Sequence, residues 1–366
     1  MRNVSIKILL FIGALTILSC SSRNNHLEHN NFIQIDLSCR KSQFPLSSFI
    51  YDIYAIKLEL PTPYFFGVIT DVLFTDSTLF VVDKKQGNVF RFKKDGTFLN
   101  RIGNRGGGPG EFLSLYNFFI GNQYVFISEL NIRQIHCYTH DGEYVKSISS
   151  TFELVYDDIA ALPNGKFLCH DIQGHKNESK IWLMNEKGDK EKTLLFHENN
   201  YPYSYTDWNT ISTTMDNKLN ILDPISGIFY LYDIEKNELA QTLHLVSEEK
   251  DLSAFRNVET LSEIKDKYAY LSFIINTDNY LYSIWSTSDN IAVCSLYEKG
   301  KKNVEVFGMP KMDFPDYSIC PIPVSTNLPN AMVAIMTDEY PLEYFPKQYR
   351  DGISEQVAVV YVMKFK

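Results

Sequence analysis

Recognisable catalytic and metal-binding motifs are largely missing from this 366-residue chain. It contains no Gly-x-Ser-x-Gly nucleophile elbow and no His-Glu-x-x-His pair, and its eight histidines do not cluster at ligand spacing. No two cysteines form a Cys-x-x-Cys motif, which argues against a zinc or thioredoxin-like site. These absences do not exclude an enzyme, because a site can be assembled from distant segments, but they leave the reaction class open.

Positive charge is also scarce. Lys and Arg total 35 against 44 Asp and Glu, for a net charge of −9. Removal of Arg2 and Lys7 with a targeting signal would leave 33 basic residues against 44 acidic ones, a net charge of −11. An acidic surface without a basic stripe argues against nucleic acid and against anionic lipid as partners.

The first twenty residues form a candidate targeting signal. A positively charged start is followed by the apolar core Ile8–Leu18, which is too short to span a bilayer permanently, and Ile17-Leu-Ser-Cys20 resembles a bacterial lipobox. In that resemblance Cys20 is diacylated after cleavage; the alternative is an ordinary secretory signal in which Cys20 is incidental. We expect a polar tether over 21–32 and one domain over 33–366, because no other stretch reaches about 18 consecutive apolar residues.

What the chain does contain is a repeated tight turn. Gly or Asn supplies the positive φ that a short hairpin turn requires, and the flanking runs favour strands. The steps between successive turns are 46, 46, 49 and 63 residues. A period in the forties that is built from hairpins predicts the blades of a β-propeller. The turns lie at Gly96, Gly142, Gly188, Asn237 and Gly300.

The two ends of the chain predict how the ring closes. Each repeat divides into four strands, but the sixth unit ends with Gln356–Lys366, where a fourth strand is still due. The alternating segment Asp52–Leu60 precedes the first complete repeat. If it completes the last blade, no sheet edge is left exposed. We therefore predict an all-β fold: a six-bladed β-propeller of four-stranded antiparallel blades, closed by an N-terminal strand.

The longer fifth step predicts an inserted helix over 248–267. Ser247 is a suitable N-cap, and two glutamates follow it in the first turn, where the helix dipole favours negative charge. Apolar residues then recur at threes and fours, which predicts an amphipathic helix packed on the ring. They are Leu252, Phe255, Val258, Leu261, Ile264 and Tyr268.

Five cysteines remain when Cys20 is set aside, so they cannot all pair within the chain. Cys137 and Cys294 lie in predicted strands, and we expect them to pack as small hydrophobes. Cys39 with Cys320 is the one pairing we consider, because ring closure should bring the ends of the chain together. The fifth is Cys169.

Several of these features together resemble the six-bladed β-propeller lipoproteins of Gram-negative bacteria, relatives of the NHL-repeat propellers. They are the lipobox, the Val-Val-Asp83 strand end, the Asp-Gly turns and the segment Ile102–Phe112, and the resemblance spans about residues 33–366. It implies the architecture and a cell-envelope location, but no activity, since proteins of this fold bind, scaffold or catalyse.

The loop Gly106-Gly-Gly-Pro-Gly-Glu-Phe112 is the most distinctive motif of that resemblance. Its glycines would let backbone N–H groups approach an anion. However, no Gly-Lys-Ser/Thr follows and no helix start is predicted, which argues against a nucleotide site. The alternative is a tight crossing between blades, with Phe112 packed between two sheets.

Four carboxylates recur at the ends of second strands, on the face that commonly carries function in a propeller. Converging carboxylates would supply hard oxygen ligands to Ca²⁺, and some six-bladed propeller hydrolases and lactonases hold a metal at the axial opening. The alternative is that each carboxylate accepts backbone N–H bonds from its own turn. His170 and His175, five residues apart, would either pair on a metal or face solvent. The four carboxylates are Asp83, Glu129, Asp171 and Asp223.

The segment from Tyr201 to Trp208 is the densest aromatic loop of the chain and is predicted on the same face. Exposed aromatic rings beside Asp and Asn suit stacking on sugar rings or on a peptide; the alternative is packing on a neighbouring blade. The candidate ligand-binding residues are Tyr201, Tyr203, Tyr205 and Trp208, with Arg105, Arg133 and His170 as polar companions.

The sequence therefore favours a monomeric, lipid-anchored binding or scaffold module for a glycan or a partner protein, without nucleic acid and without a cofactor other than Ca²⁺. A metal-dependent hydrolase or lyase that uses the axial carboxylates is the alternative, and a structural protein of an envelope complex is a third hypothesis. Ser21–Asn25 lacks the acidic run expected of a surface-export signal, which favours an outer-membrane location facing the periplasm, with display on the cell surface as the alternative.

Overall fold

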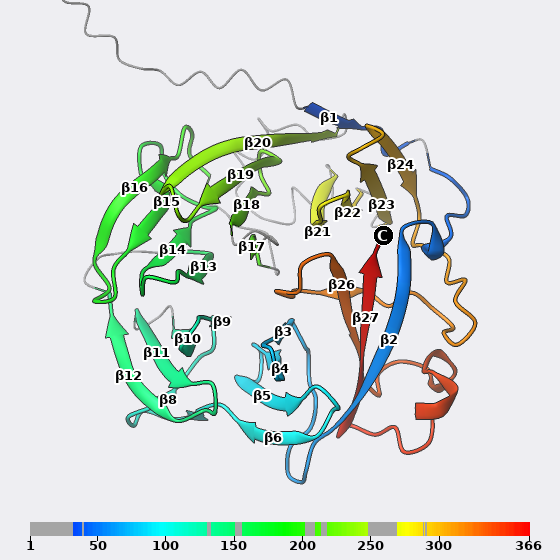
Figure 1. Ribbon diagram of the computed structural model, residues 1–366, viewed down its shortest axis with the longest axis horizontal. Coiled ribbons are helices and arrows are strands. Elements are labelled where there is room, and N and C mark those ends of the chain that lie inside the picture. The colour runs from blue at the N-terminus through cyan, green and yellow to red at the C-terminus, as the bar shows by residue number, and fades with distance from the viewer. Residues whose placement is uncertain are drawn as a thin grey trace, which may run out of the picture.

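A computed structural model describes residues 32–38, 40–129, 133–150, 156–201, 209–213, 218–247, 269–287, 289 and 291–366. Six antiparallel sheets stand around a central axis as the blades of a propeller (Figure 1). The predicted six-bladed β-propeller of four-stranded blades is therefore confirmed.

The first three blades follow one another in the chain, and each runs outward from an inner strand to an outer strand. Blade 1 consists of β3 (Asp71–Phe74), β4 (Thr78–Asp83), β5 (Asn88–Lys93) and β6 (Phe98–Arg101). Blade 2 consists of β9 (Asn117–Ile120), β10 (Tyr124–Glu129), β11 (Gln134–Thr139) and β12 (Tyr144–Ser149). Blade 3 consists of β13 (Asp158–Ala161), β14 (Phe167–His170), β15 (Ser179–Met184) and β16 (Lys190–Phe196).

The other three blades complete the ring. Blade 4 consists of β17 (Ile211–Thr213), β18 (Leu219–Asp223), β19 (Ile228–Asp233) and β20 (Glu238–Ser247). Blade 5 consists of β21 (Tyr270–Asn276), β22 (Tyr280–Ser286), β23 (Ala292–Glu298) and β24 (Asn303–Phe307). Blade 6 consists of β25 (Pro323–Val324), β26 (Ala331–Met336), β27 (Val357–Phe365) and β2 (Ile50–Glu59).

The predicted closure of the ring is confirmed. β2 pairs with β27 along its whole length, from Ile50 opposite Phe365 to Glu59 opposite Val357. Ile56 lies directly opposite Val360 in this register. The last blade is thus built from both ends of the described chain, and the antiparallel ladder leaves no open seam between blade 6 and blade 1.

Four of the five predicted turns have the expected backbone. Gly96, Gly142, Gly188 and Asn237 have φ values of 91°, 93°, 90° and 55°. The fifth prediction is wrong in detail, because the left-handed residue between β23 and β24 is Lys302, with φ of 52°, and not Gly300. Four residues separate these strands, and the left-handed residue is the last of the four, as Asn237 is between β19 and β20.

A strand that was not predicted from the sequence joins the N-terminal segment to the ring at a second place. β1 (Phe32–Ile35) pairs in parallel with β20, with Phe32 opposite His244, and gives blade 4 a fifth strand. The chain then passes outside blade 5, where Lys41 bridges to Phe307, and reaches β2 through the short helix η1 (Leu46–Ser48) (Figure 1). Residues 32–49 therefore tie blades 4, 5 and 6 together from outside.

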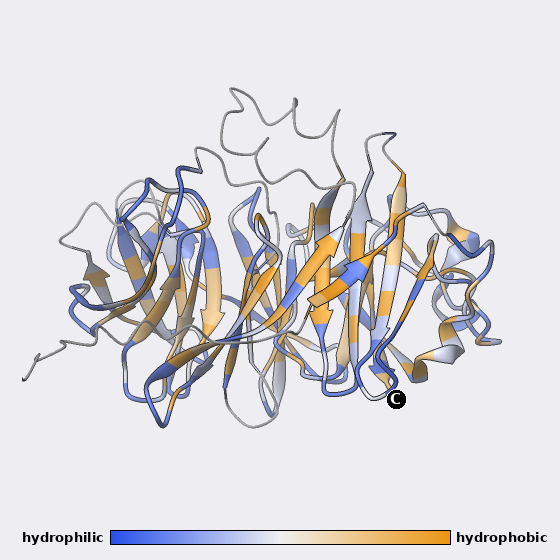
Figure 2. Ribbon diagram, turned by 90° about the horizontal axis from the view of Figure 1, so that it is seen from above, coloured by the Kyte–Doolittle hydropathy of each residue, from blue (hydrophilic) through white to orange (hydrophobic). Residues whose placement is uncertain are grey.

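The core is divided among the spaces between neighbouring blades. In the side view of Figure 2, the hydrophobic residues lie mainly in the strands and the loops above and below them are largely hydrophilic. β4 and β26 are buried at every residue because sheets cover both of their faces. Phe112, in the short strand β8 (Glu111–Phe112), is 1% exposed and packs among side chains of blades 1 and 2. The predicted crossing with a buried Phe112 is therefore confirmed.

The predicted inserted helix and the predictions about the cysteines have different outcomes. The expected helix over 248–267 lies outside the described residues, and the helices of the described part are η1, η3 (Leu342–Tyr344) and η4 (Lys347–Tyr349). None of them has the length and hydropathy needed to cross a membrane. Cys137 and Cys294 are buried in strands as expected. Cys320 carries a free thiol, which does not support the disulfide that we considered between it and Cys39, a residue outside the described ranges.

Candidate ligand-binding site in the central channel

One face of the ring collects the turns after the second strands and the crossings between blades; we call it the site face. In an up-and-down antiparallel blade, the end of the second strand and the start of the inner strand lie at the same edge. Asp83, Glu129, Asp171 and Asp223 end β4, β10, β14 and β18 or directly follow them, so all four belong to this face. The strand topology therefore places the four carboxylates on one face, as the sequence predicted.

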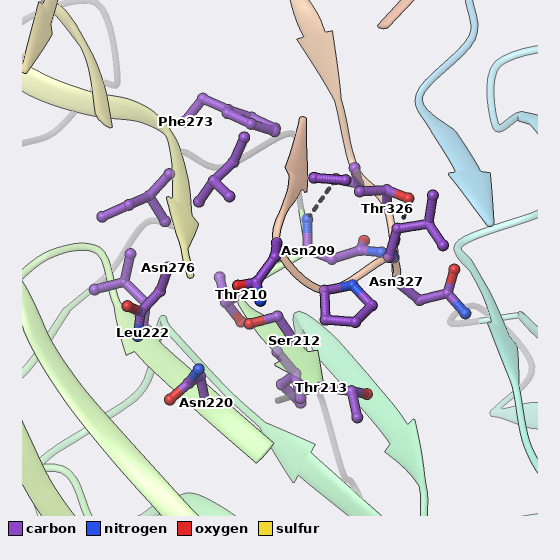
Figure 3. Close-up of a pocket in the computed structure, with 18 of the residues that line it drawn as sticks. Asn209, Thr210, Ser212, Thr213, Asn220, Leu222, Phe273, Asn276, Thr326 and Asn327 are labelled. Carbon is purple, nitrogen blue, oxygen red and sulfur yellow. Dashed lines mark hydrogen bonds between the residues drawn. The ribbon is translucent and has the colours of Figure 1, made fainter. Parts of the chain in front are cut away.

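Beside the axis, the inner strands of blades 4, 5 and 6 enclose a cavity. Side chains of β17, β21 and the loop between β25 and β26 line it (Figure 3). None of its lining residues carries a formal charge, and amides and hydroxyls predominate among its polar groups. These are Asn209, Thr210, Ser212, Thr213, Asn220, Asn276, Ser325, Thr326, Asn327 and Asn330.

Some of these polar side chains hold the wall of the cavity in place. Asn327 accepts a hydrogen bond from the amide of Phe74 (2.7 Å) and donates one to its carbonyl (2.8 Å), which fixes the blade 6 loop against blade 1. Asn330 accepts from the amide of Asp278 (2.9 Å) and donates to its carboxylate (2.8 Å). The Ser325 hydroxyl accepts from the amide of Asn209 (3.1 Å). The loop is therefore rigidly positioned.

At least one other polar group of the cavity does not hydrogen-bond to the wall. Asn276 Oδ1 is buried and has no hydrogen-bond partner among the described residues. Asn220, on the neighbouring strand β18, lines the same cavity, and so do Ser212 and Thr213 (Figure 3). A buried carbonyl oxygen without a partner costs free energy, so it is expected to bind water or a ligand. The cavity thus presents at least one unused acceptor, Asn276 Oδ1, among the described residues.

Lys84 reaches across the mouth of the channel beside this cavity. It follows β4 in blade 1, and its Nζ lies 3.3 Å from Asp71 Oδ2 and 3.4 Å from Asn209 Oδ1. Asn209 Nδ2 in turn donates to Asp71 Oδ1 at 2.8 Å. Because blades 1 and 4 face each other across the ring (Figure 1), this triangle joins opposite walls and narrows the mouth.

The four predicted carboxylates do not group around one point, and Asp83 Oδ2 and Asp171 Oδ1 are buried without a hydrogen-bond partner among the described residues. Asp83 accepts the amide of Gln86 (2.9 Å), and Asp223 accepts the amide of Ile225 (3.1 Å). Burial raises the pKa of Asp83. Within the described ranges, no three His, Cys, Asp or Glu side chains are grouped closely enough to hold a metal ion. The hydrogen bonds favour the turn-capping alternative, while the Ca²⁺ hypothesis stays a prediction.

Glu129 shows most clearly how a carboxylate holds a crossing. Its Oε1 accepts the amides of Leu113 (2.7 Å) and Ser114 (2.8 Å), and its Oε2 lies 2.9 Å from His136 Nε2. His136 Nδ1 lies 2.9 Å from the hydroxyl of Ser147. The order of carboxylate, imidazole and hydroxyl is that of a nucleophile relay. However, Ser147 lies on the outermost strand, so we assign this network to holding blade 2.

A second polar cluster is buried between blades 3 and 4. Lys180 forms an ion pair with Asp223, and His170 Nδ1 lies 2.8 Å from the Thr210 hydroxyl. Burial and the charge of Lys180 lower the pKa of His170 to about 3 and that of His197 to about 4. Burial and the neighbouring Asp157 raise the pKa of Asp171 to about 9. The cluster is therefore a mixture of neutral groups around one ion pair at neutral pH.

We expect wild-type stability to decline between pH 6.5 and 9 because of Asp171. An unfolded Asp ionises near a pKa of about 4, whereas folded Asp171 keeps its proton up to about 9. The unfolded state then binds fewer protons in this window, so the free energy of unfolding falls as pH rises. His170 and His197 have lowered pKa values, so below pH 6.5 they make the free energy of unfolding rise with pH, which is opposite to the effect of Asp171.

Asp171→Asn should flatten this alkaline decline, because the amide keeps the shape of the side chain and cannot ionise. Chemical denaturation at pH 6.5, 7.5 and 9 measures the slope, with the exposed turn residue Asp76 replaced by Asn as a control. Equal slopes for Asp171→Asn and wild type would contradict the assignment.

The other predicted ligand residues are scattered over the site face. Tyr201 is buried and bridges to Gly174, so it packs on blade 3 rather than facing solvent. Arg105 is exposed in β7 (Asn104–Arg105), in the crossing from blade 1 to blade 2, and Arg133 is exposed in the turn between β10 and β11 within blade 2. His170 is buried and His175 is exposed, so these two do not pair. Tyr203, Tyr205 and Trp208 lie outside the described residues.

No sequence pattern indicated the cavity residues. Asn, Ser and Thr are common at strand starts and turns, so their presence there is unremarkable. They come from three blades and gather only when the ring closes. The one usable clue is that Asn209 directly follows the aromatic segment that was singled out as a ligand-contacting loop.

The ring and its channel define the chain as a six-bladed β-propeller. It belongs to the family described as domain of unknown function DUF4934, whose model matches residues 32–357. A protein of Bacteroides fragilis described as exported is similar in structure, with a TM-score of 0.73 at 15% identity over 92% of this chain and 99% of that chain. A DUF4221 family member from Bacteroides vulgatus has a TM-score of 0.54 at 8% identity over 86% of this chain and 96% of that chain. At these identities the likeness shows the fold alone, and no curated protein matches the sequence.

Proposed function

We propose that this propeller is an exported, lipid-anchored binding module of the cell envelope, and that its channel cavity binds an uncharged, hydroxyl-rich ligand such as a glycan. The observation that carries the proposal is the cavity lining, which is rich in amides and hydroxyls and free of formal charge. Sugar hydroxyls both donate and accept, so they match Asn and Ser/Thr side chains, whereas a charged ligand would find no counter-charge there.

The geometry limits how much of a ligand enters. The cavity offers about 60 Å³ to the centres of water molecules, and one water needs about 10–15 Å³. A single substituent or one edge of a sugar ring fits this volume, so the rest of the ligand would lie in the channel. The half-buried Phe273 supplies an aromatic surface in the same wall. The aromatic segment that ends at Trp208 joins the cavity at Asn209 and remains a proposed extension of the site.

Export and anchoring are supported by the N-terminal segment and by the similar Bacteroides fragilis protein described as exported. β1 begins at Phe32, so eleven residues separate it from Cys20. A chain of this length spans at most about 40 Å when fully extended. An acyl anchor at Cys20 would therefore keep the propeller close to its membrane, attached at the outer edge of blade 4.

Glycan binding is tested by calorimetry with neutral oligosaccharides that a glycan array first selects. The variant Asn220→Leu/Asn276→Leu removes polar groups of the cavity and should weaken binding about tenfold or more, or about 1.4 kcal/mol. Asn122→Leu, in an exposed turn of blade 2, is the matched control and should bind like wild type. Absence of any array signal for the wild type, or equal affinity of the double variant, would refute the proposal.

A further inference from the structure

The inner edge of blade 6 is incomplete. β26 has six residues, but β25 has only two, and they pair with Val333 and Ala334. The chain then leaves blade 6 for blade 1: the Ser325 carbonyl accepts the amide of Val72 (2.9 Å), and the Ser325 amide donates to the carbonyl of Thr70 (3.1 Å). That departure lies beside the start of β26. Toward the site face, β25 begins only at Pro323, opposite Ala334, so no described residue pairs with the inner side of β26 beyond Ala334.

The hydrogen-bond ladder shows which backbone groups are exposed by this gap. The amide of Phe365 donates to the carbonyl of Asn330 at 3.0 Å, so alternation directs residues 332, 334 and 336 of β26 toward β27. The backbone N–H and C=O of Ile335 are therefore directed toward the channel side, next to the point where β25 begins at Pro323. No described residue forms a backbone hydrogen bond with Ile335 on that side. Its side chain is 6% exposed, and unpaired backbone groups in such surroundings are costly.

A cleft of about 410 Å³ lies beside this open edge, and its lining is mainly apolar. Val68 and Ile322 are 51% and 62% exposed and contribute to the lining, although aliphatic side chains of this size are usually buried. Glu339, exposed in the turn after β26, is the charged residue of the lining. The cleft thus combines an unpaired strand edge, an apolar trough and one negative charge.

We propose that this cleft binds an extended peptide segment of a partner protein, which adds to the inner edge of β26 as a short strand. Strand addition would satisfy the amide and carbonyl of Ile335, and alternate apolar side chains would enter the trough. A Lys or Arg of the peptide would face Glu339. This partner site goes beyond the glycan proposal and uses different residues, apart from Phe273 and Ser325, which line both spaces.

The test begins with a random heptapeptide library displayed on phage, selected on the full-length mature protein and counter-selected on Val68→Arg. This substitution places a long cation in the trough. We expect enriched sequences in which aliphatic residues alternate and a Lys or Arg is present. Lack of enrichment on wild type over Val68→Arg would overturn the proposal.

Synthetic copies of an enriched peptide then separate strand addition from simple apolar contact. Fluorescence anisotropy should show about tenfold weaker binding to Glu339→Lys, and a similar loss when one peptide amide in the paired stretch is N-methylated. Phe196→Arg changes an exposed apolar side chain of blade 3 and should leave affinity unchanged. The amide of Ile335 should become protected from hydrogen exchange; unchanged exchange, or indifference to N-methylation, would refute strand addition. Asn220→Leu/Asn276→Leu should still bind the peptide, so the two proposals can fail independently.

Discussion

Leu58→Asp should prevent the ring from closing and leave the chain unfolded. Leu58 lies in β2, is fully buried, and packs with Ala358 and Val360 in the cluster between blades 6 and 1. Loss of a buried Leu costs about 2–5 kcal/mol, and an unpaired buried carboxylate adds several more. Whole domains are stable by only about 5–15 kcal/mol. The substitution therefore removes most or all of the stability of the fold.

Circular dichroism and size-exclusion chromatography measure this outcome. Glu59→Gln changes the next residue of the same strand, which is exposed, and should keep the melting temperature of wild type. Leu58→Ala should remain folded with a loss of about 2–5 kcal/mol in urea denaturation. A cooperative, wild-type-like melt of Leu58→Asp would show that β2 is dispensable for the ring.

Lys180→Met should destabilise the propeller by about 3–5 kcal/mol, because it leaves Asp223 buried without its counter-charge. The ion pair between Lys180 and Asp223 is almost completely buried, and Lys180 Nζ also lies 5.8 Å from the centre of the Tyr201 ring. Burial alone would raise the pKa of Asp223, but Lys180 and Ser226 hold it well below its usual range. The ionised carboxylate is therefore the form that the fold requires.

The double variant Lys180→Met/Asp223→Asn distinguishes the charge effect from lost packing. It should recover part of the stability that Lys180→Met loses, since no unpaired charge then remains. Guanidinium denaturation at pH 7 provides the comparison. In the wild type, the contribution of Asp223 to the free energy of unfolding should also decrease as the pH falls below about 4, because the lowered pKa makes the folded state bind fewer protons than the unfolded state. Equal stability of the single and double variants would contradict this account.

The candidate site could be predicted only in part, and the particular residues show why. The carboxylates after the second strands were placed correctly on one face, because that follows from strand alternation alone. The absence of a common meeting point for them could not be read from the sequence. Glu129 turns to the amides of Leu113 and Ser114, and Asp223 turns to Lys180 of the preceding blade. Which neighbour a side chain meets depends on the crossing loops, whose paths carry no periodic signal.

The sequence by itself determined the blade repeat, the number of blades and the pairing of the segment around Ile56 with the C-terminal strand, since hairpin turns and alternating strands are local patterns and an unfinished blade has one available complement. Only the tertiary structure decided that β1 joins blade 4, that uncharged side chains from three blades enclose a cavity, and that β26 keeps an open edge beside Ile335. These features arise between segments far apart in the chain. Their energies depend on distances that become defined only when the ring closes.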